Sequence, residues 1–93
     1  MTNKYEAVLI FSVKNGDEAV TALVEKFKEL IGSNGTVEGV DEWGKRRLAY
    51  LINDEPEGYY AIYSFESAPE FPAELERVAK ITEDVLRVMT VKK

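Results

Sequence analysis

The spacing of hydrophobic residues changes along the chain, and each change predicts an element of secondary structure. Residues 5–13 are a short run of apolar and aromatic residues, which is typical of a buried strand. From residue 18 to residue 31 the apolar positions recur every three or four residues, which indicates a helix with one buried face. Asp17 is the expected N-cap of this helix. The segment 32–35, which holds two glycines, is expected to end it in a left-handed turn.

The middle of the chain predicts a hairpin of two strands. Residues 36–52 predict a long strand that carries many charges, and Gly39 and Gly44 within it indicate bends or bulges. Residues 53–58 have the composition of a hairpin loop. Residues 59–66 predict a third strand that is dense in aromatic residues. Its side chains should alternate between two faces, with Ala61, Tyr63 and Phe65 on one and Tyr60, Ile62 and Ser64 on the other.

A second helix and a last strand complete the pattern. Pro69 and Pro72 introduce the helix, and Pro72 fits its first turn because the missing N–H would have no partner there. The apolar stripe expected for this helix is narrower than that of the first and consists of Leu75, Val78 and Ile81. Residues 85–91 predict the last strand.

The order strand, helix, strand, strand, helix, strand predicts an α+β protein with the ferredoxin-like split βαβ fold (β-α-β-β-α-β). Right-handed crossovers would place both helices on one face of a four-stranded antiparallel sheet with strand order 2-3-1-4. The charged strand of residues 36–52 would then be an edge, and the other sheet face would stay open. With 93 residues, we expect a single domain that spans residues 1–93.

Two residue types are missing, and their absence excludes most catalytic chemistry. The chain has no cysteine, so we expect no disulfide, thiolate metal site or thiol nucleophile. It has no histidine, which is the commonest general base and metal ligand. The sequence therefore predicts a protein that is not an enzyme and holds no metal or cofactor. Residues 1–4 do not begin a signal peptide, and no apolar run is long enough to cross a membrane, which predicts a cytoplasmic location.

The formal net charge of −5 argues against nucleic-acid binding, because neutralisation of phosphates normally supplies much of the affinity. The charge is unevenly distributed, however. Residues 45–47 form a basic run, and Arg87, Lys92 and Lys93 lie near the end of the chain. The start of the first strand should lie beside the end of the last, because the two are antiparallel neighbours in the expected sheet. Lys4, Lys92 and Lys93 should then form one basic patch, with Arg87 further along.

The fold alone leaves the function open, because it hosts RNA-recognition modules, metabolite sensors, metal carriers and acylphosphatases. Metal carriers need cysteines in the first loop, and the chain has none. Acylphosphatases need an arginine in that loop, where this chain has Lys14 and the turn-forming Asn15. Residues 57–64 match the RNA-recognition octamer poorly, because Ala61 and Ser64 occupy two of the stacking positions. A metabolite-sensing homodimer is the main alternative, followed by an acylphosphatase-like hydrolase.

The charged strand of residues 36–52 allows two interpretations. On an edge strand, charges prevent unwanted pairing with other chains, and the residues alone favour this explanation. The alternative is that the charges set the register of a specific partner, with aromatic side chains as anchors. Tyr60 and Ile62 should lie on the open face with Val8 and Ile10, and monomers rarely leave such apolar patches uncovered. The candidate docking residues are therefore Asp41, Glu42, Trp43, Arg46, Arg47, Tyr60 and Ile62.

A family resemblance favours one function. Residues 43–50 (Trp-Gly-Lys-Arg-Arg-Leu-Ala-Tyr), followed by a turn and the Gly-Tyr-Tyr of residues 58–60, resemble the hallmark of the bacterial small-subunit ribosomal protein six family. Residues 4–6 and 86–92 also resemble that family, in the right places. The resemblance covers essentially the whole chain. It implies a structural component of the bacterial small ribosomal subunit, associated with the ribosome.

The resemblance also implies partners. Members of that family bind the central domain of small-subunit ribosomal RNA together with ribosomal protein eighteen, a small basic protein, as a heterodimer. An acidic protein can bind RNA when a basic partner contributes part of the phosphate neutralisation. The RNA-binding residues expected on this basis are Lys4, Arg87, Lys92 and Lys93. The residues expected to serve only the core are Phe27, Leu30, Phe65, Leu75 and Val78.

Overall fold

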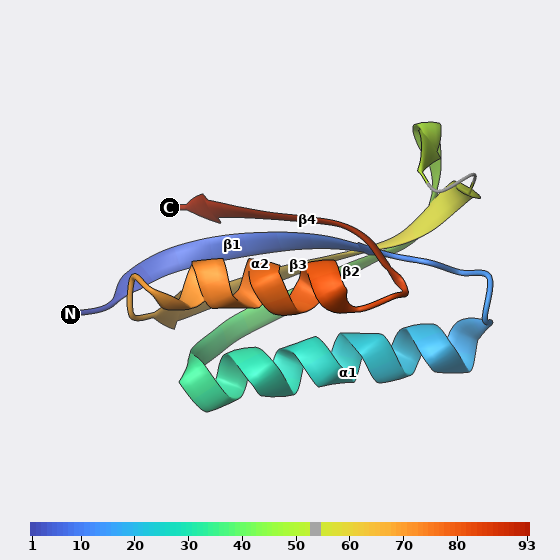
Figure 1. Ribbon diagram of the computed structural model, residues 1–93. Helices are drawn as coiled ribbons and strands as arrows, with labels where there is room; N and C mark the ends of the chain where they lie inside the picture. Colours follow the sequence, from blue (N-terminus) through green and yellow to red (C-terminus); the bar gives the residue numbers. More distant parts are fainter. Residues whose placement is uncertain (53–54) are drawn as a thin grey trace.

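The computed structural model describes residues 1–52 and 55–93 and has the predicted order of elements. The elements are β1 (Asn3–Phe11), α1 (Asp17–Asn34), β2 (Gly35–Ile52), β3 (Glu55–Ser67), α2 (Phe71–Ile81) and β4 (Val85–Lys92). The strands form one antiparallel sheet in the order β2-β3-β1-β4, and both helices cover the same face (Figure 1). The ferredoxin-like fold and the strand order 2-3-1-4 are therefore confirmed.

The hydrophobic core lies between the two helices and the sheet face that they cover. Alternate residues of the central strands β1 and β3 point into it, as the period of a strand requires. The hydroxyl of the buried Tyr63 donates a hydrogen bond to the carbonyl oxygen of Val24, 2.9 Å away, so this polar atom is satisfied. Burial also raises the pKa of this hydroxyl. The predicted core residues lie here: Phe27, Phe65 and Leu75 are fully buried, and Leu30 and Val78 pack against the core.

The predicted N-cap of α1 was wrong, and its C-terminal end was predicted in the right segment but in the wrong conformation. The N-cap is Gly16, with φ of 89°, and Asp17 is the first residue of the helix and makes no side-chain cap. A carboxylate in the first turn still interacts favourably with the helix dipole, which explains why Asp17 marks the right place. At the other end the helix continues through Gly32 to Asn34, and Gly35 is extended, with φ of −177°, instead of left-handed.

Gly35 is glycine because its backbone approaches β3 closely. A Cβ at this position would lie 2.2 Å from the carbonyl oxygen of Glu66. Replacing Gly35 by alanine should therefore lower the free energy of unfolding by about 2–3 kcal/mol, because the methyl group would push β2 away from β3. Urea denaturation would measure the change.

The matched control is Gly32→Ala, inside α1. A Cβ at Gly32 would meet only the Val37 Cγ2 atom, at 4.0 Å. Alanine has the higher helix propensity, so this variant should be more stable than the parent by about 0.5–1 kcal/mol. Equal stability of the Gly35→Ala variant and the parent would contradict the close approach.

The hairpin differs from the sequence prediction in the length of its second strand. β3 begins at Glu55, so residues 55–58, which were predicted as part of the loop, belong to the strand. The rest of that loop, residues 53 and 54, lies outside the described residues. The far ends of β2 and β3 bend away from the rest of the sheet, toward the side opposite the helices (Figure 1).

The buried stripe of α2 also differs from the prediction. Pro72 lies in the first turn, as expected. The buried residues are Phe71, Pro72, Leu75 and Ala79, whereas Ile81 is 71% exposed. The reason is that α2 ends at Ile81, so its last side chain extends past the edge of the core. The small Ala79 lets the helix pack closely on the sheet, and a search for large apolar residues overlooks it.

Candidate interaction surface on the open sheet face

The face of the sheet opposite the helices carries two kinds of side chain. Strand alternation places every second residue of β1, β3 and β4 on it. Apolar residues occupy one half of this open face, and charged or hydroxyl residues predominate in the half near both chain termini, where the half-exposed Val91, opposite Glu6, is an apolar exception. The apolar half contains Val8, Ile10, Tyr60, Ile62 and Met89, and the polar half contains Lys4, Glu6, Ser64, Glu66 and Lys93.

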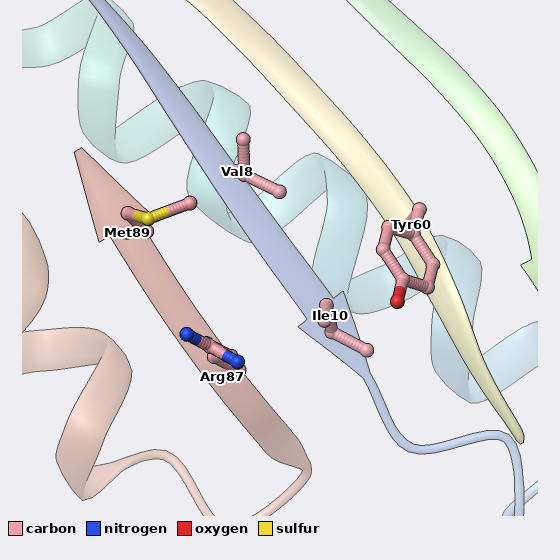
Figure 2. Close-up of a pocket in the computed structure, with 5 residues that line it drawn as sticks. All are labelled: Val8, Ile10, Tyr60, Arg87 and Met89. Atoms are coloured by element: carbon pink, nitrogen blue, oxygen red, sulfur yellow. The ribbon is translucent and has the colours of Figure 1, made fainter. Parts of the chain in front are cut away.

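The apolar half is hollowed. Figure 2 shows five side chains around a shallow pocket of about 210 Å³, contributed by three neighbouring strands: Val8, Ile10, Tyr60, Arg87 and Met89. β1 runs through the middle, with Met89 of β4 opposite Val8 on one side and Tyr60 of β3 opposite Ile10 on the other. Met89 is 46% exposed, although it is apolar. The pocket therefore offers an apolar surface with one cationic side chain at its border.

Two bulges in β2 each add one more side chain to this face. The register between β2 and β3 shifts just before Gly39 and again just before Gly44, which has φ of 82°. These shifts confirm the bulges predicted at the two glycines. The extra residues are Glu38 in the first bulge and Trp43 in the second. Bulges commonly redirect a side chain in this way beside a functional site.

Trp43 extends the apolar half of the open face onto the edge strand. Its ring stacks on that of Tyr60, with the centroids 6.4 Å apart and the planes 14° from parallel. The indole Nε1 donates a hydrogen bond of 2.9 Å to the Asp41 carboxylate. The side chain remains 49% exposed. It is therefore not a core residue, and it is held in a fixed orientation on the surface, which suits an anchor for a partner.

The charged residues of β2 do not share one face. Asp41 is opposite Ile62 and Arg46 is opposite Gly58, on the open face. Glu42 and Arg47 alternate with them and face the helix side. There, Glu42 accepts a 2.8 Å hydrogen bond from the Tyr59 hydroxyl. That bond is the main cause of the raised pKa of Tyr59.

The cationic residues predicted to bind RNA are also divided between faces. The backbone N–H of Lys93 donates to the carbonyl oxygen of Lys4, 2.9 Å away, so these two lysines are neighbours on the open face. Lys92 is opposite Tyr5, whose side chain is buried in the core, so Lys92 belongs to the helix side. Arg87 lies at the other end of β4, beside the apolar pocket. The three lysines thus gather at one corner of the sheet, but they do not form one flat patch.

The two open-face lysines are paired with glutamates. The Lys4 ammonium lies 3.5 Å from the Glu38 carboxylate, and the Lys93 ammonium lies 3.7 Å from that of Glu6. Lys93 also donates to the Ser64 hydroxyl at 3.3 Å. Both ion pairs are partly exposed to solvent. Sequence reasoning missed these glutamates, because a register is needed to see which charges meet.

Other candidate sites have weaker support. In the first loop, the Asn15 side chain donates to the Asp84 carboxylate at 3.1 Å, so it ties this loop to the loop before β4. Within the described residues, no three acidic side chains come together as a metal site would require. No helix in the described part of the chain is both long and apolar enough to cross a membrane.

The fold and its surface together define a class of protein. A split βαβ sheet with helices on one face, and with an apolar pocket, a stacked aromatic pair and ion pairs on the other, is typical of a module that binds another macromolecule.

Comparison with known proteins identifies the family. Residues 4–92 match the family described as "Ribosomal protein S6", and the chain belongs to this family. The chain is 50% identical over 88 residues to the small ribosomal subunit protein bS6 of Clostridium novyi. This alignment covers 94% of this chain and 93% of that protein. It is 46% identical over 90 residues to bS6 of Alkaliphilus oremlandii, covering 97% and 96% of the two chains.

A solved structure supports the same assignment. The crystal structure of 30S ribosomal protein S6 from Thermotoga maritima superposes with a TM-score of 0.93 at 27% sequence identity. The match covers 100% of this chain and 89% of that one. The resemblance found in the sequence is therefore confirmed.

Proposed function

We propose that this chain is a structural, non-catalytic component of the small ribosomal subunit. In this proposal it binds the central domain of small-subunit ribosomal RNA together with ribosomal protein eighteen. The observation that carries the proposal is the two-part open face, where an apolar docking surface adjoins a strip of charges. Family membership supports the assignment to the subunit.

The apolar half of the open face is the proposed site for the partner protein. Protein surfaces seldom leave a contiguous group of apolar and aromatic side chains uncovered unless it binds something. Trp43, at 49% exposure, and Met89, at 46%, flank the pocket on opposite sides. Asp41 adds a negative charge beside Trp43, which would complement a basic partner.

The corner where both chain termini lie is the proposed RNA-binding site. β4 and the residue after it carry Arg87, Lys92 and Lys93 and no acidic residue. Lys4 joins them through the antiparallel pairing of β1 and β4. Since the partner surface lies next to this corner on the same sheet, RNA could touch both proteins at once. A basic partner would then supply phosphate neutralisation that a chain of net charge −5 lacks.

Neutralising two lysines tests this RNA-binding site. In the Lys92→Gln/Lys93→Gln variant, affinity for the RNA central domain should fall, and log affinity should depend less steeply on log salt. Each lysine that no longer neutralises a phosphate should reduce the slope by somewhat under one unit. Filter binding at several salt concentrations, with ribosomal protein eighteen present, would measure this.

The control for that experiment is Lys26→Gln/Lys28→Gln, which removes the same charge from the exposed surface of α1. It should leave the slope unchanged. Equal slopes for both variants would show that Lys92 and Lys93 are ordinary solvated residues. A parent protein that forms a homodimer and has no affinity for the RNA would favour the metabolite-sensing alternative.

A further inference from the structure

The lysine side chains of the open face lie along the sheet and reach groups on other strands, although both stay partly exposed to solvent. Lys4 is on β1 and Glu38 is on β2, with β3 between them, yet their charged groups are 3.5 Å apart. Lys93 follows β4 and bonds to Ser64 on β3, with β1 between them. Neighbouring strands are about 4.8 Å apart. Each lysine side chain must therefore be extended along the sheet to reach across the strand next to it. Both ammonium groups are therefore held over the middle strands.

The glutamates are what hold these ammonium groups there. Glu38 reaches the open face only because the first bulge of β2 inserts it there. Glu6 is on β1, between Lys93 and Ser64, and its carboxylate lies 3.7 Å from the Lys93 ammonium. The Glu66 carboxylate, opposite Lys4, instead accepts a hydrogen bond from the Thr2 hydroxyl. Each of the two lysines on this half of the face thus has a glutamate carboxylate beside its ammonium group.

These two ion pairs have a consequence for ligands that carry only phosphate. A phosphate that binds either ammonium comes to rest near the paired carboxylate, so attraction and repulsion partly cancel. A folded RNA can also present 2′-hydroxyl and base amino groups. These groups can donate hydrogen bonds to a carboxylate. The glutamates would therefore lower the affinity for a ligand that offers only phosphates more than the affinity for a folded RNA.

We infer that Glu6 and Glu38 are positioning residues that set the selectivity of the RNA surface, because they hold Lys93 and Lys4 and so suppress binding to generic phosphate chains. The inference rests on the proposed function for its biological meaning. The suppression of phosphate binding by the two glutamates can itself be measured without ribosomal RNA.

The test compares charge removal at two places. Glu6→Gln/Glu38→Gln releases the lysines, and Glu25→Gln/Glu29→Gln removes the same charge from the exposed surface of α1. The probe is a fluorescent oligothymidylate, which offers phosphates but no 2′-hydroxyl groups. Fluorescence anisotropy should show about three- to tenfold tighter binding for the first variant than for the second. Its salt dependence should be steeper by up to about 0.7 for each released lysine.

Two further measurements decide the mechanism. Adding Lys4→Gln/Lys93→Gln to the Glu6→Gln/Glu38→Gln variant should abolish the gain. Affinity for the RNA central domain, with ribosomal protein eighteen present, should rise less than affinity for oligothymidylate. The inference is overturned if the two glutamate variants behave alike, if the gain survives without the lysines, or if both ligands gain equally. Failure of the parent protein to bind the ribosomal RNA would instead overturn the proposed function.

Discussion

Replacing Ile62 by aspartate should leave the chain folded and weaken its binding to ribosomal protein eighteen by about a hundredfold. Ile62 lies in the centre of the open face, opposite Val8 on one side and Asp41 on the other. Docking there would bury the new carboxylate among apolar groups and next to an existing negative charge. Burial of a charge in such a place costs several kcal/mol, whereas the free protein leaves it in water. Isothermal titration calorimetry would measure the loss.

The matched control is Ile81→Asp, the same substitution at a side chain that is 71% exposed at the end of α2. It lies outside the open face, so binding to the partner should be unchanged. Circular dichroism would verify that both variants are folded. If the two variants bind the partner equally well, the apolar half of the open face is not the docking surface.

Most of the fold could be predicted because its signals are local. The three-to-four-residue spacing of apolar positions in α1 and the two-residue alternation in β3 fix the type of each element and its buried face. Helix ends were harder to predict. The helix does end just before Gly35, as predicted, but a glycine is required there because of the carbonyl oxygen of Glu66, which is far away in the sequence.

The candidate site could be predicted only in part, because it depends on the register between strands. Alternation alone placed Tyr60 and Ile62 correctly on the open face. The same rule applied to β4 would also have found Met89, two residues beyond Arg87. The positions of Glu38 and Trp43 could not be derived from alternation, because each is the extra residue of a bulge. The signal that marks both is a glycine directly after them.

Removing the charges of β2 should make the folded chain self-associate. β2 is an edge of the sheet, so one side of it has backbone N–H and C=O groups without partners in the sheet. Its charges are the main obstacle to pairing with a second copy. A variant with valine at Asp41, Glu42, Arg46 and Arg47 would present a strand of high β-propensity instead. Sedimentation velocity should then show dimers or larger species.

The same variant should also bind ribosomal protein eighteen more weakly. It loses the Asp41 carboxylate that holds the Trp43 indole, and with it the acidic group that would complement a basic partner. The matched control replaces two acidic and two basic residues of α1, Glu25, Lys26, Lys28 and Glu29, by alanine, which leaves the net charge unchanged in the same way. That control should remain monomeric and bind the partner normally. A β2 variant that behaves like the control would mean that the edge charges neither guard the strand nor contribute to docking.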